Sequence, residues 1–127
     1  MKNIKCKFCE KHNLIGETDF FKLMYDKYPV TDGHILIISK SHKENYSKLD
    51  NNEKKDLFEA IDLAQTIIKA KYNVEEFNVG FNQGYNAGQT IFHFHCHVIP
   101  RRMNDIENPE GGIRCVIHNK QKYNESI

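Results

Sequence analysis

A regular alternation of polar and apolar residues between positions 88 and 101 marks the clearest strand of the chain. His93, His95 and His97 lie two residues apart, which is the side-chain period of a β-strand. The three imidazoles are therefore predicted to share one face of that strand. The opposite face is predicted to pack into the core through Phe92, Phe94, Cys96 and Val98.

Apolar segments elsewhere predict further strands. Residues 18–26 are rich in aromatic side chains, and residues 34–39 form a continuous apolar run that is typical of a strand covered on both faces. Residues 77–81 predict another strand, and residues 113–117 predict a short one. The glycines of segment 82–88 permit an ordinary turn or a cradle of backbone N–H groups for phosphate, and we favour the cradle.

One long helix is predicted from about residue 51 to residue 71. The sequence Asp50-Asn51-Asn52-Glu53 is typical of a capping box, and apolar residues then recur at helical spacing, at Leu57, Ile61, Ala64 and Ile68. Together with the strands, this helix predicts an α+β fold in which one long helix covers an antiparallel sheet of about five strands. A short helix or loop is expected before the first strand.

The composition limits the possible partners. A length of 127 residues fits a single domain over residues 1–127, with a polar tail from about residue 118 to residue 127 that is expected to be flexible. With 18 basic and 17 acidic residues, neither nucleic acid nor a membrane surface is an expected partner. Four cysteines and no visible signal peptide favour a reducing compartment, so we expect a cytoplasmic protein.

Two patterns suggest chemistry, and the residues alone leave alternatives for each. Cys6 and Cys9 form a C-x-x-C, which is compatible with half of a zinc site, a redox pair or chance. The alternating histidines are compatible with core residues, a metal site or catalytic groups. One ion cannot easily bind all three, because the outer two Cα atoms of such a strand segment lie about 13 Å apart. At least one imidazole is therefore left for other chemistry.

The segment His93-Phe94-His95-Cys96-His97-Val98-Ile99, preceded by Gly88-Gln89-Thr90, closely resembles the motif of the histidine-triad (HIT) superfamily of nucleotide hydrolases and transferases. The resemblance covers nearly the whole chain, from the cysteine pair to beyond the histidine strand. It implies a HIT-like fold, a homodimer and a purine-nucleotide substrate that contains AMP. It implies no organic cofactor.

The resemblance also assigns roles to individual residues. His95 matches the nucleophile that forms a covalent nucleotidyl-histidine, and neutral imidazole is available for this at pH 7 because its ordinary pKa is about 6.5. His97 would contact the phosphate oxygens, while His34 and His93 would shape the pocket. The remaining nucleotide contacts would come from Asp26 and Asn82 near the ribose and from Gly88, Gln89 and Thr90 around the phosphate. The Thr90 hydroxyl would also have a catalytic role, in helping the leaving group to depart.

The C-x-x-C has a counterpart in many bacterial HIT proteins, which this chain resembles. There the motif is completed by two histidines, and the matching ligands here are Cys6, Cys9, His42 and His93. Two thiolates and two imidazoles suit tetrahedral Zn²⁺, which would attach the N-terminal segment to the sheet. The resemblance therefore implies a structural zinc ion.

The sequence carries mixed signals about the substrate. Gln89-Thr90 resembles the branch that cleaves dinucleoside polyphosphates, whereas Asp26 and the C-x-x-C resemble the phosphoramidase-like branch. We expect a hydrolase that releases a nucleoside monophosphate from a nucleoside phosphoramidate or a dinucleoside polyphosphate. The alternative is a nucleotide-binding regulatory module with little turnover.

Overall fold

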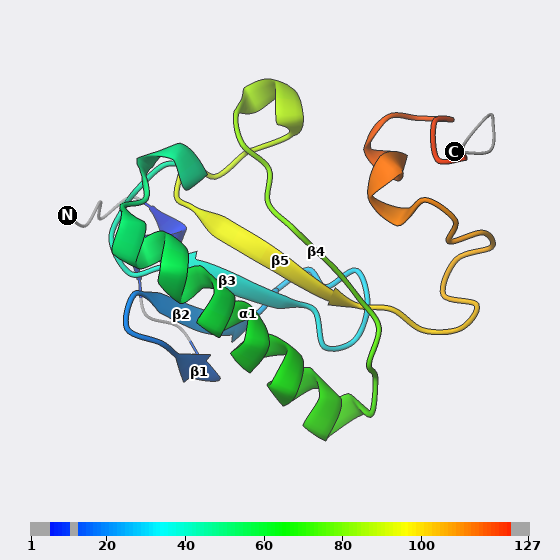
Figure 1. The fold of residues 1–127 in the computed structure, drawn as a ribbon, viewed down its shortest axis with the longest axis horizontal. Helices are drawn as coiled ribbons and strands as arrows, with labels where there is room; N and C mark the ends of the chain where they lie inside the picture. The colour runs from blue at the N-terminus through cyan, green and yellow to red at the C-terminus, as the bar shows by residue number, and fades with distance from the viewer. Residues whose placement is uncertain (1–5, 11–12, 123–127) are drawn as a thin grey trace.

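The structure is a computed structural model that describes residues 6–10 and 13–122. Five strands form one antiparallel sheet in the order β1-β2-β3-β5-β4 (Figure 1). The strands are β1 (Gly16–Glu17), β2 (Phe21–Tyr25), β3 (Ile35–Ser39), β4 (Phe77–Gly80) and β5 (His95–Pro100). With one long helix beside it, this sheet confirms the predicted α+β fold.

The helix α1 (Asn51–Tyr72) lies across one face of the sheet (Figure 1). The predicted capping box is present, because Asp50 accepts from the Glu53 N–H while Glu53 accepts from the Asp50 N–H. The helix ends at Asn73, which adopts the left-handed conformation. Its buried stripe, which packs on the sheet, contains Leu57, Ala60, Ala64 and Ile68.

Strand β3 is buried on both faces, as its continuous apolar run predicts. Ile35 and Ile37 belong to the core under α1. Leu36 and Ile38 point to the opposite face, where they lie beside two histidines of β5: Leu36 pairs with His97 and Ile38 pairs with His95. The antiparallel register therefore places His95 and His97 on the face that α1 leaves uncovered.

Part of the predicted alternation is wrong. Phe94, Cys96 and Val98 are buried, but Phe92 is 44% exposed. Residues 91–93 form a bend, and β5 begins only at His95. Strict side-chain alternation requires extended backbone, so the pattern does not hold at the residues before the strand.

Two other predicted strands also differ from the structure. Residues 18–26 contain a turn followed by β2, and β1 lies before them, so the aromatic segment is the second arm of a small hairpin. Residues 113–117 were predicted as a strand, but residues Gly112–Val116 form the 3-10 helix η4. The positive φ angles of Gly111 and Gly112 turn the chain there, away from an extended path.

Three further 3-10 turns connect these elements: η1 (Lys7–Cys9), η2 (Tyr46–Lys48) and η3 (Tyr85–Ala87). The first lies before β1, where the sequence predicted a short helix or a loop. The flexible tail predicted for residues 118–127 lies partly outside the described residues. Within the part of the chain that the structure describes, no helix is long and apolar enough to cross a membrane.

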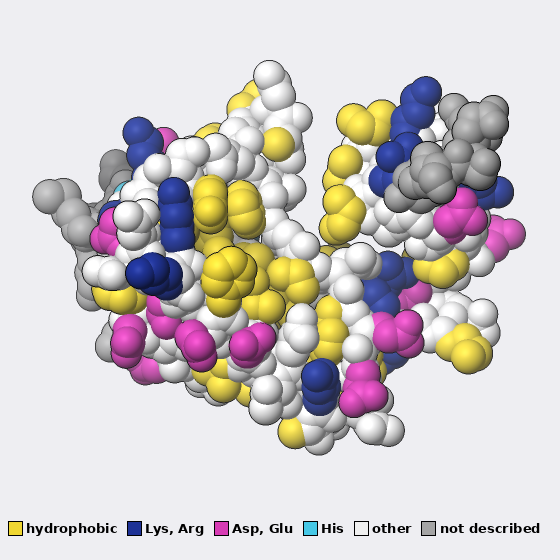
Figure 2. Space-filling view, in the orientation of Figure 1, with side chains coloured by type: hydrophobic (Ala, Val, Ile, Leu, Met, Phe, Trp, Pro, Cys, Tyr) yellow, Lys and Arg dark blue, Asp and Glu magenta, His cyan; other side chains and the backbone are white. Residues whose placement is uncertain are grey.

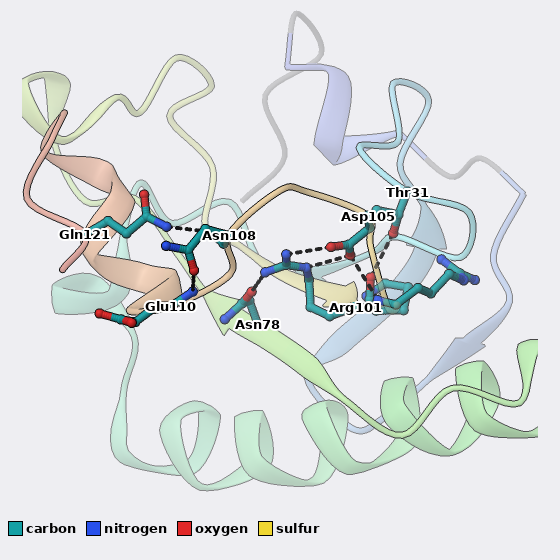
Figure 3. A network of polar contacts seen from close by, with 9 residues as sticks. Thr31, Asn78, Arg101, Asp105, Asn108, Glu110 and Gln121 are labelled. Carbon is teal, nitrogen blue, oxygen red and sulfur yellow. Dashed lines mark hydrogen bonds and ion pairs between the residues drawn. The ribbon is translucent and has the colours of Figure 1, made fainter.

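A polar network fixes the chain directly after β5 (Figure 3). The Arg101 guanidinium donates to both carboxylate oxygens of Asp105 at 2.8 Å and to the side-chain oxygen of Asn78 on β4. Such a bidentate pair orients both partners. Beyond it, the C-terminal segment approaches β4 at Gly112, next to Asn78. A hollow of about 770 Å³ lies between the start of β4 and the chain after β5, and Figure 2 shows a gap between the C-terminal segment and the loop before β5.

Candidate functional site

A pocket of about 590 Å³ opens on the sheet face opposite α1. His95 and His97 from β5 and Leu36 from β3 contribute to its floor. Most of the predicted nucleotide-binding residues line it, although they come from separate parts of the chain: Asp26, Asn82, Gly88, Thr90, His95 and His97. The fold thus brings together residues that span more than half of the sequence.

The hydrogen bond on one side of His95 fixes which ring nitrogen carries a lone pair. The Nδ1 atom lies 2.8 Å from the backbone oxygen of His93. Because a carbonyl can only accept, Nδ1 carries the proton and Nε2 carries the lone pair. Burial lowers the pKa of His95, against the opposing effects of this hydrogen bond and of the Asp26 charge. The imidazole is therefore neutral at pH 7 and has a free nucleophilic nitrogen.

His97 has the opposite tautomer, because its Nδ1 accepts a hydrogen bond from His34, whose own tautomer is set by Val30. The backbone N–H of Val30 donates to Nδ1 of His34 at 3.2 Å, so the proton of neutral His34 is on Nε2. That Nε2–H donates to Nδ1 of His97 at 2.9 Å. His97 therefore carries its own proton on Nε2, where it can donate to an anion in the pocket.

The surroundings of this pair keep both rings neutral. Burial, together with the neighbouring His34 and His95, lowers the pKa of His97 to about 4. Burial also lowers the pKa of His34, against the opposing charge of Asp26. His34 is buried behind His97 and does not line the pocket. Its predicted role in shaping the pocket can therefore only be exerted through His97 and Asp26, which its Nε2 faces.

The loop before the histidine strand differs from the predicted phosphate cradle. Gly84 and Gly88 have positive φ angles, as a tight turn requires. The Gly88 N–H, however, donates to the Tyr85 oxygen at 3.0 Å, and the Gln89 N–H donates to the Gly84 oxygen at 3.1 Å. These donors are used inside the loop, so in this conformation they are not available to a phosphate.

Gln89 supports this loop from below. Its side-chain oxygen accepts from the Gly84 N–H at 2.9 Å, and its side-chain nitrogen donates to the Glu44 oxygen at 2.6 Å. The residue is buried and does not line the pocket. The structure therefore gives Gln89 a scaffolding role instead of the predicted contact with the nucleotide.

A second group of side chains converges beside the pocket. One ligand atom each from Cys6, Cys9, His42 and His93 lies within 4.8 Å of all the others. The Cys9 sulfur is 3.2 Å from Nδ1 of His42 and 3.5 Å from Nδ1 of His93, and the two Nδ1 atoms are 3.1 Å apart. Ligand-to-ligand distances of about 3.3–3.8 Å follow from ordinary tetrahedral zinc bond lengths. The cluster therefore could hold a metal ion with little rearrangement.

The hydrogen bonding of the cluster also suits a metal. Nε2 of His93 donates to the Ser39 oxygen at 2.7 Å, which leaves the Nδ1 lone pair directed at the sulfurs. Such an outer partner is typical of metal-binding histidines. Burial lowers the pKa of His93 to about 4, so this imidazole is neutral, as a metal ligand must be. Burial raises the pKa of the Cys6 thiol, so a bound cation would be needed to stabilise its thiolate at this place.

Asp26, His34 and His97 form another group whose ligand atoms lie within 4.8 Å of one another. This group suits a metal less well. The Val30 N–H places the His34 proton on Nε2, which is the nitrogen that faces His97 and Asp26. A metal there would require Nε2 of His34 to lose this proton. The proton could not move to Nδ1 without pointing at the Val30 N–H.

His93 was predicted both as a pocket residue and as a metal ligand. The structure places its side chain in the cysteine cluster and not in the lining of the pocket, and only its backbone oxygen reaches His95. Sequence reasoning missed the residues near Cys6 and Cys9 that line the pocket, Lys7, Phe8 and Glu10. Their position within and next to the C-x-x-C was the available signal.

Imidazoles that alternate along a strand and face a cavity on the uncovered side of an antiparallel sheet define the histidine-triad class of domains. The comparison with protein families agrees, since the HIT domain matches residues 8–104. The chain belongs to the HIT family.

Relatives by sequence include proteins with and without a named activity. A 16.1 kDa HIT-like protein of Mycoplasma pneumoniae is 33% identical over 109 residues, which cover 80% of this chain and 74% of the relative. The asymmetrical bis(5'-nucleosyl)-tetraphosphatase of Schizosaccharomyces pombe is 34% identical over 78 residues, 61% of this chain and 43% of that enzyme. The chain thus spans less than half of the tetraphosphatase.

Two solved structures show the same fold. A HIT family protein from Bacillus anthracis is 34% identical with a TM-score of 0.72, over 79% of this chain and 75% of that one. A zinc-bound histidine triad family protein from Mycobacterium smegmatis is 28% identical with a TM-score of 0.73, over 80% and 78%. These similarities confirm the predicted family and the predicted five-stranded fold.

Proposed function

We propose that the protein is a hydrolase that cleaves a nucleoside phosphoramidate or a dinucleoside polyphosphate through a covalent nucleotidyl-histidine on His95. The observation that carries the proposal is the tautomer of His95, whose Nδ1–H is held by the His93 oxygen at 2.8 Å. This leaves the Nε2 lone pair available in a pocket that can hold a nucleotide. The tetraphosphatase activity named for a relative supports the substrate class.

In the first step, the Nε2 lone pair of His95 attacks the phosphorus attached to the nucleoside. A phosphorus–nitrogen bond forms, and the bond to the leaving group breaks. The electron pair of the broken bond stays with the leaving group, which is an amine or a nucleoside polyphosphate. His97 faces the same pocket with a proton on Nε2, so it can donate to a phosphate oxygen or to the departing atom.

In the second step, water attacks the phosphorus of the phosphoramidate. The phosphorus–nitrogen bond breaks and its electron pair returns to Nε2 of His95. One proton of the water replaces the proton that Nε2 of His97 gave to the leaving group, or passes to solvent where His97 kept its own. The product is a nucleoside monophosphate, and the enzyme returns to its starting state. Asp26 and Asn82, which line the pocket, would hold the ribose throughout both steps, and Thr90 would contact the phosphate.

Rapid quenching with a labelled substrate tests this mechanism. A nucleotide trapped on the protein should be labile in acid and stable in base, as a phosphoramidate is, and His95→Ala should trap none. Diadenosine polyphosphates and an adenosine phosphoramidate, assayed in parallel, would separate the two substrate classes by kcat/KM. Absence of any trapped nucleotide during rapid turnover would refute the covalent step.

A nucleotide-binding regulatory module with little turnover is the second candidate. It is favoured by the loop before β5, whose Gly88 and Gln89 N–H groups are turned inward and away from a phosphate. Binding of nucleoside monophosphate without hydrolysis of either substrate class would establish this candidate. Hydrolysis that depends on His95 would exclude it.

We also propose structural Zn²⁺ in the cluster of Cys6, Cys9, His42 and His93. The four ligands fit this ion in type and spacing, and bound zinc would hold the N-terminal turn against the sheet. None of the four cysteines, all of which are described, forms a disulfide. This supports a reducing compartment, and a cytoplasmic location is part of the proposal.

A homodimer is the proposed assembly. Hydrophobic side chains gather where α1 meets β4 (Figure 2), and Phe58 there is 72% exposed. Among the described strands, only β5 pairs with β4, so one edge of β4 is open. Sedimentation at micromolar concentration should show a species of twice the 14.9 kDa chain mass, and Phe58→Glu should shift it towards the monomer. A wild-type protein that stays monomeric would refute the proposal.

A further inference from the structure

The turn between the two cysteines forms one wall of the pocket. Phe8, in the middle of η1, packs edge-on against the His95 ring, with 4.8 Å between ring centroids and 66° between planes. On its other sides Phe8 contacts the small apolar cluster of Met24, Leu36 and Ile38 on the sheet. Its ring therefore lies on the uncovered face of the sheet, in contact with the imidazole that carries the proposed nucleophile.

The position of this wall depends on the cysteine cluster. The turn η1 lies outside the sheet, so no strand pairing fixes it. Cys6 and Cys9 flank Phe8 on either side, and their sulfurs lie 3.4 Å and 3.5 Å from Nδ1 of His93. A metal ion bound by these atoms would replace such weak thiol–imidazole contacts by coordinate bonds.

A second connection runs through His93. Its Nδ1 belongs to the cluster, its Nε2 is held by Ser39, and its backbone oxygen accepts the Nδ1–H of His95. Displacement of the His93 side chain would therefore disturb the acceptor that orients His95. The ring of His95 is thus held from two directions, by Phe8 and by His93, and both residues are attached to the same cluster.

We propose that Phe8 is a positioning residue for His95, and that metal bound by Cys6, Cys9, His42 and His93 sets the affinity of the pocket for nucleotide by holding Phe8 in place. This inference rests on the proposed function for the role of His95. Its part about nucleotide affinity can be tested without turnover. The metal would then not only attach the N-terminal segment to the sheet but also determine how tightly the pocket binds nucleotide.

The test measures nucleoside monophosphate affinity by calorimetry on four samples, which are wild type and Phe8→Ala, each with zinc and without it. Zinc is removed with a chelator, and the chelator is then removed by dialysis. Loss of one aromatic contact is worth between about twofold and about tenfold in affinity. We expect Phe8→Ala to weaken binding by that factor at full zinc content. Zinc removal should weaken wild-type binding similarly and should add little in Phe8→Ala, because both changes remove the same wall.

Positioning is separated from a general loss of structure by three further measurements. Phe8→Leu should restore most of the affinity, and Phe20→Ala, which removes a phenyl group that does not line the pocket, should leave it unchanged. The ring-proton NMR signals of His95 should shift and broaden in Phe8→Ala, because the imidazole loses the ring that packs against it, while the His93 oxygen keeps Nδ1 protonated in both proteins. In Phe8→Ala, kcat should fall together with nucleotide affinity.

Two results would overturn the inference. One is wild-type nucleotide affinity together with wild-type ring-proton signals of His95 in Phe8→Ala. The other is unchanged nucleotide affinity of the wild type after zinc removal. Failure of the proposed hydrolysis is distinguishable from failure of this inference, because nucleotide binding and its dependence on zinc can be measured in a protein that has no turnover. Trapped nucleotide on His95 together with a silent Phe8→Ala would refute this inference alone.

Discussion

His34 and His97 are joined by a 2.9 Å hydrogen bond whose direction is set by the backbone N–H of Val30. Because Val30 donates to one side of His34, the other side of His34 must donate to His97. The outward nitrogen of His97 is thereby fixed as a donor. A backbone amide in the turn before β3 thus decides the protonation of a side chain in the pocket.

Removal of this bond should slow the reaction without abolishing it. His34→Ala leaves Nδ1 of His97 without its donor, so His97 can adopt either tautomer and half-occupies the unproductive one. A hydrogen bond is worth about 0.5–1.5 kcal/mol, so kcat should fall by between about twofold and about tenfold. Steady-state kinetics, with circular dichroism as a check on folding, would measure this. An unchanged kcat would show that the tautomer of His97 does not matter.

Replacement of His95 should have a much larger effect on chemistry than on binding. His95→Ala removes the proposed nucleophile, and such losses cost at least about 10³-fold in kcat. Affinity for nucleoside monophosphate should change by only about 0.5–1.5 kcal/mol, the value of one hydrogen bond. Kinetics and calorimetry on the same preparation would compare the two. Near-wild-type kcat on every nucleotide would leave only the binding-module candidate.

Stability should fall as the pH is lowered from about 6.5 towards 4. The folded-state pKa of His97 is lowered to about 4, below its ordinary value, so the unfolded chain binds more protons in this window. The contribution of His97 to the free energy of unfolding is therefore fully present above the pKa of His97 in the unfolded chain, and it is lost as the pH falls towards the folded-state pKa. Urea midpoints should follow this slope in the wild type.

His97→Gln is the matched control for that slope, because glutamine keeps hydrogen-bonding groups but does not titrate. Burial also lowers the pKa values of His34, His93 and His95, so these side chains contribute to the slope in both proteins. The difference between the two urea curves therefore reports the titration of His97 together with its electrostatic effect on His34 and His95. Parallel curves between pH 6.5 and 4 would contradict the prediction.

Metal analysis should find about one zinc ion per chain in protein purified without chelator or added metal. Cys6→Ser should lose most of this zinc, because serine is a poor ligand for it. Cys115→Ser is the control, since Cys115 is exposed and lies outside the cluster. Equal zinc in all three proteins, or none in the wild type, would count against the site.

Gly33 should not tolerate a side chain. Its φ is +93°, and an added Cβ would lie 2.9 Å from two atoms of the Tyr72 ring. Gly33→Ala should destabilise the fold by at least about 1–2 kcal/mol, the cost of positive φ for an L-residue. Gly80→Ala is the comparison, because no atom lies within 4 Å of its added Cβ. Chemical denaturation would rank the two variants, and equal stability would refute the prediction.

The sequence predicted the elements whose signals are local. The helix from residue 51 follows from its capping box and apolar stripe, and the burial of β3 follows from its apolar run. The family motif also predicted which residues gather in the pocket and in the cysteine cluster. The helix and strand signals are strong because each depends on side chains that are close in the sequence. The residues of the pocket and of the cysteine cluster are far apart in the chain and were indicated only by the family resemblance.

The alternation of the three histidines did not predict their different surroundings, although the family resemblance assigned His93 to the cysteine cluster as well as to the pocket. His93, His95 and His97 have identical spacing, but a bend before β5 turns His93 into the cluster, while the other two face the pocket. The use of the Gly88 N–H inside its loop is equally invisible in the sequence. Both depend on backbone geometry that no pattern of residue types encodes.

The burial of Cys96 has a practical consequence. Burial raises the pKa of this thiol to about 12, so it forms almost no thiolate at neutral pH and should not react with alkylating reagents in the folded protein. Cys115 is exposed and should always react. Cys6 and Cys9 are then the thiols whose reactivity depends on bound metal. The number of cysteines labelled in the native protein should therefore rise from one to three as zinc is removed, so a simple colour reaction would report how much of a sample carries metal.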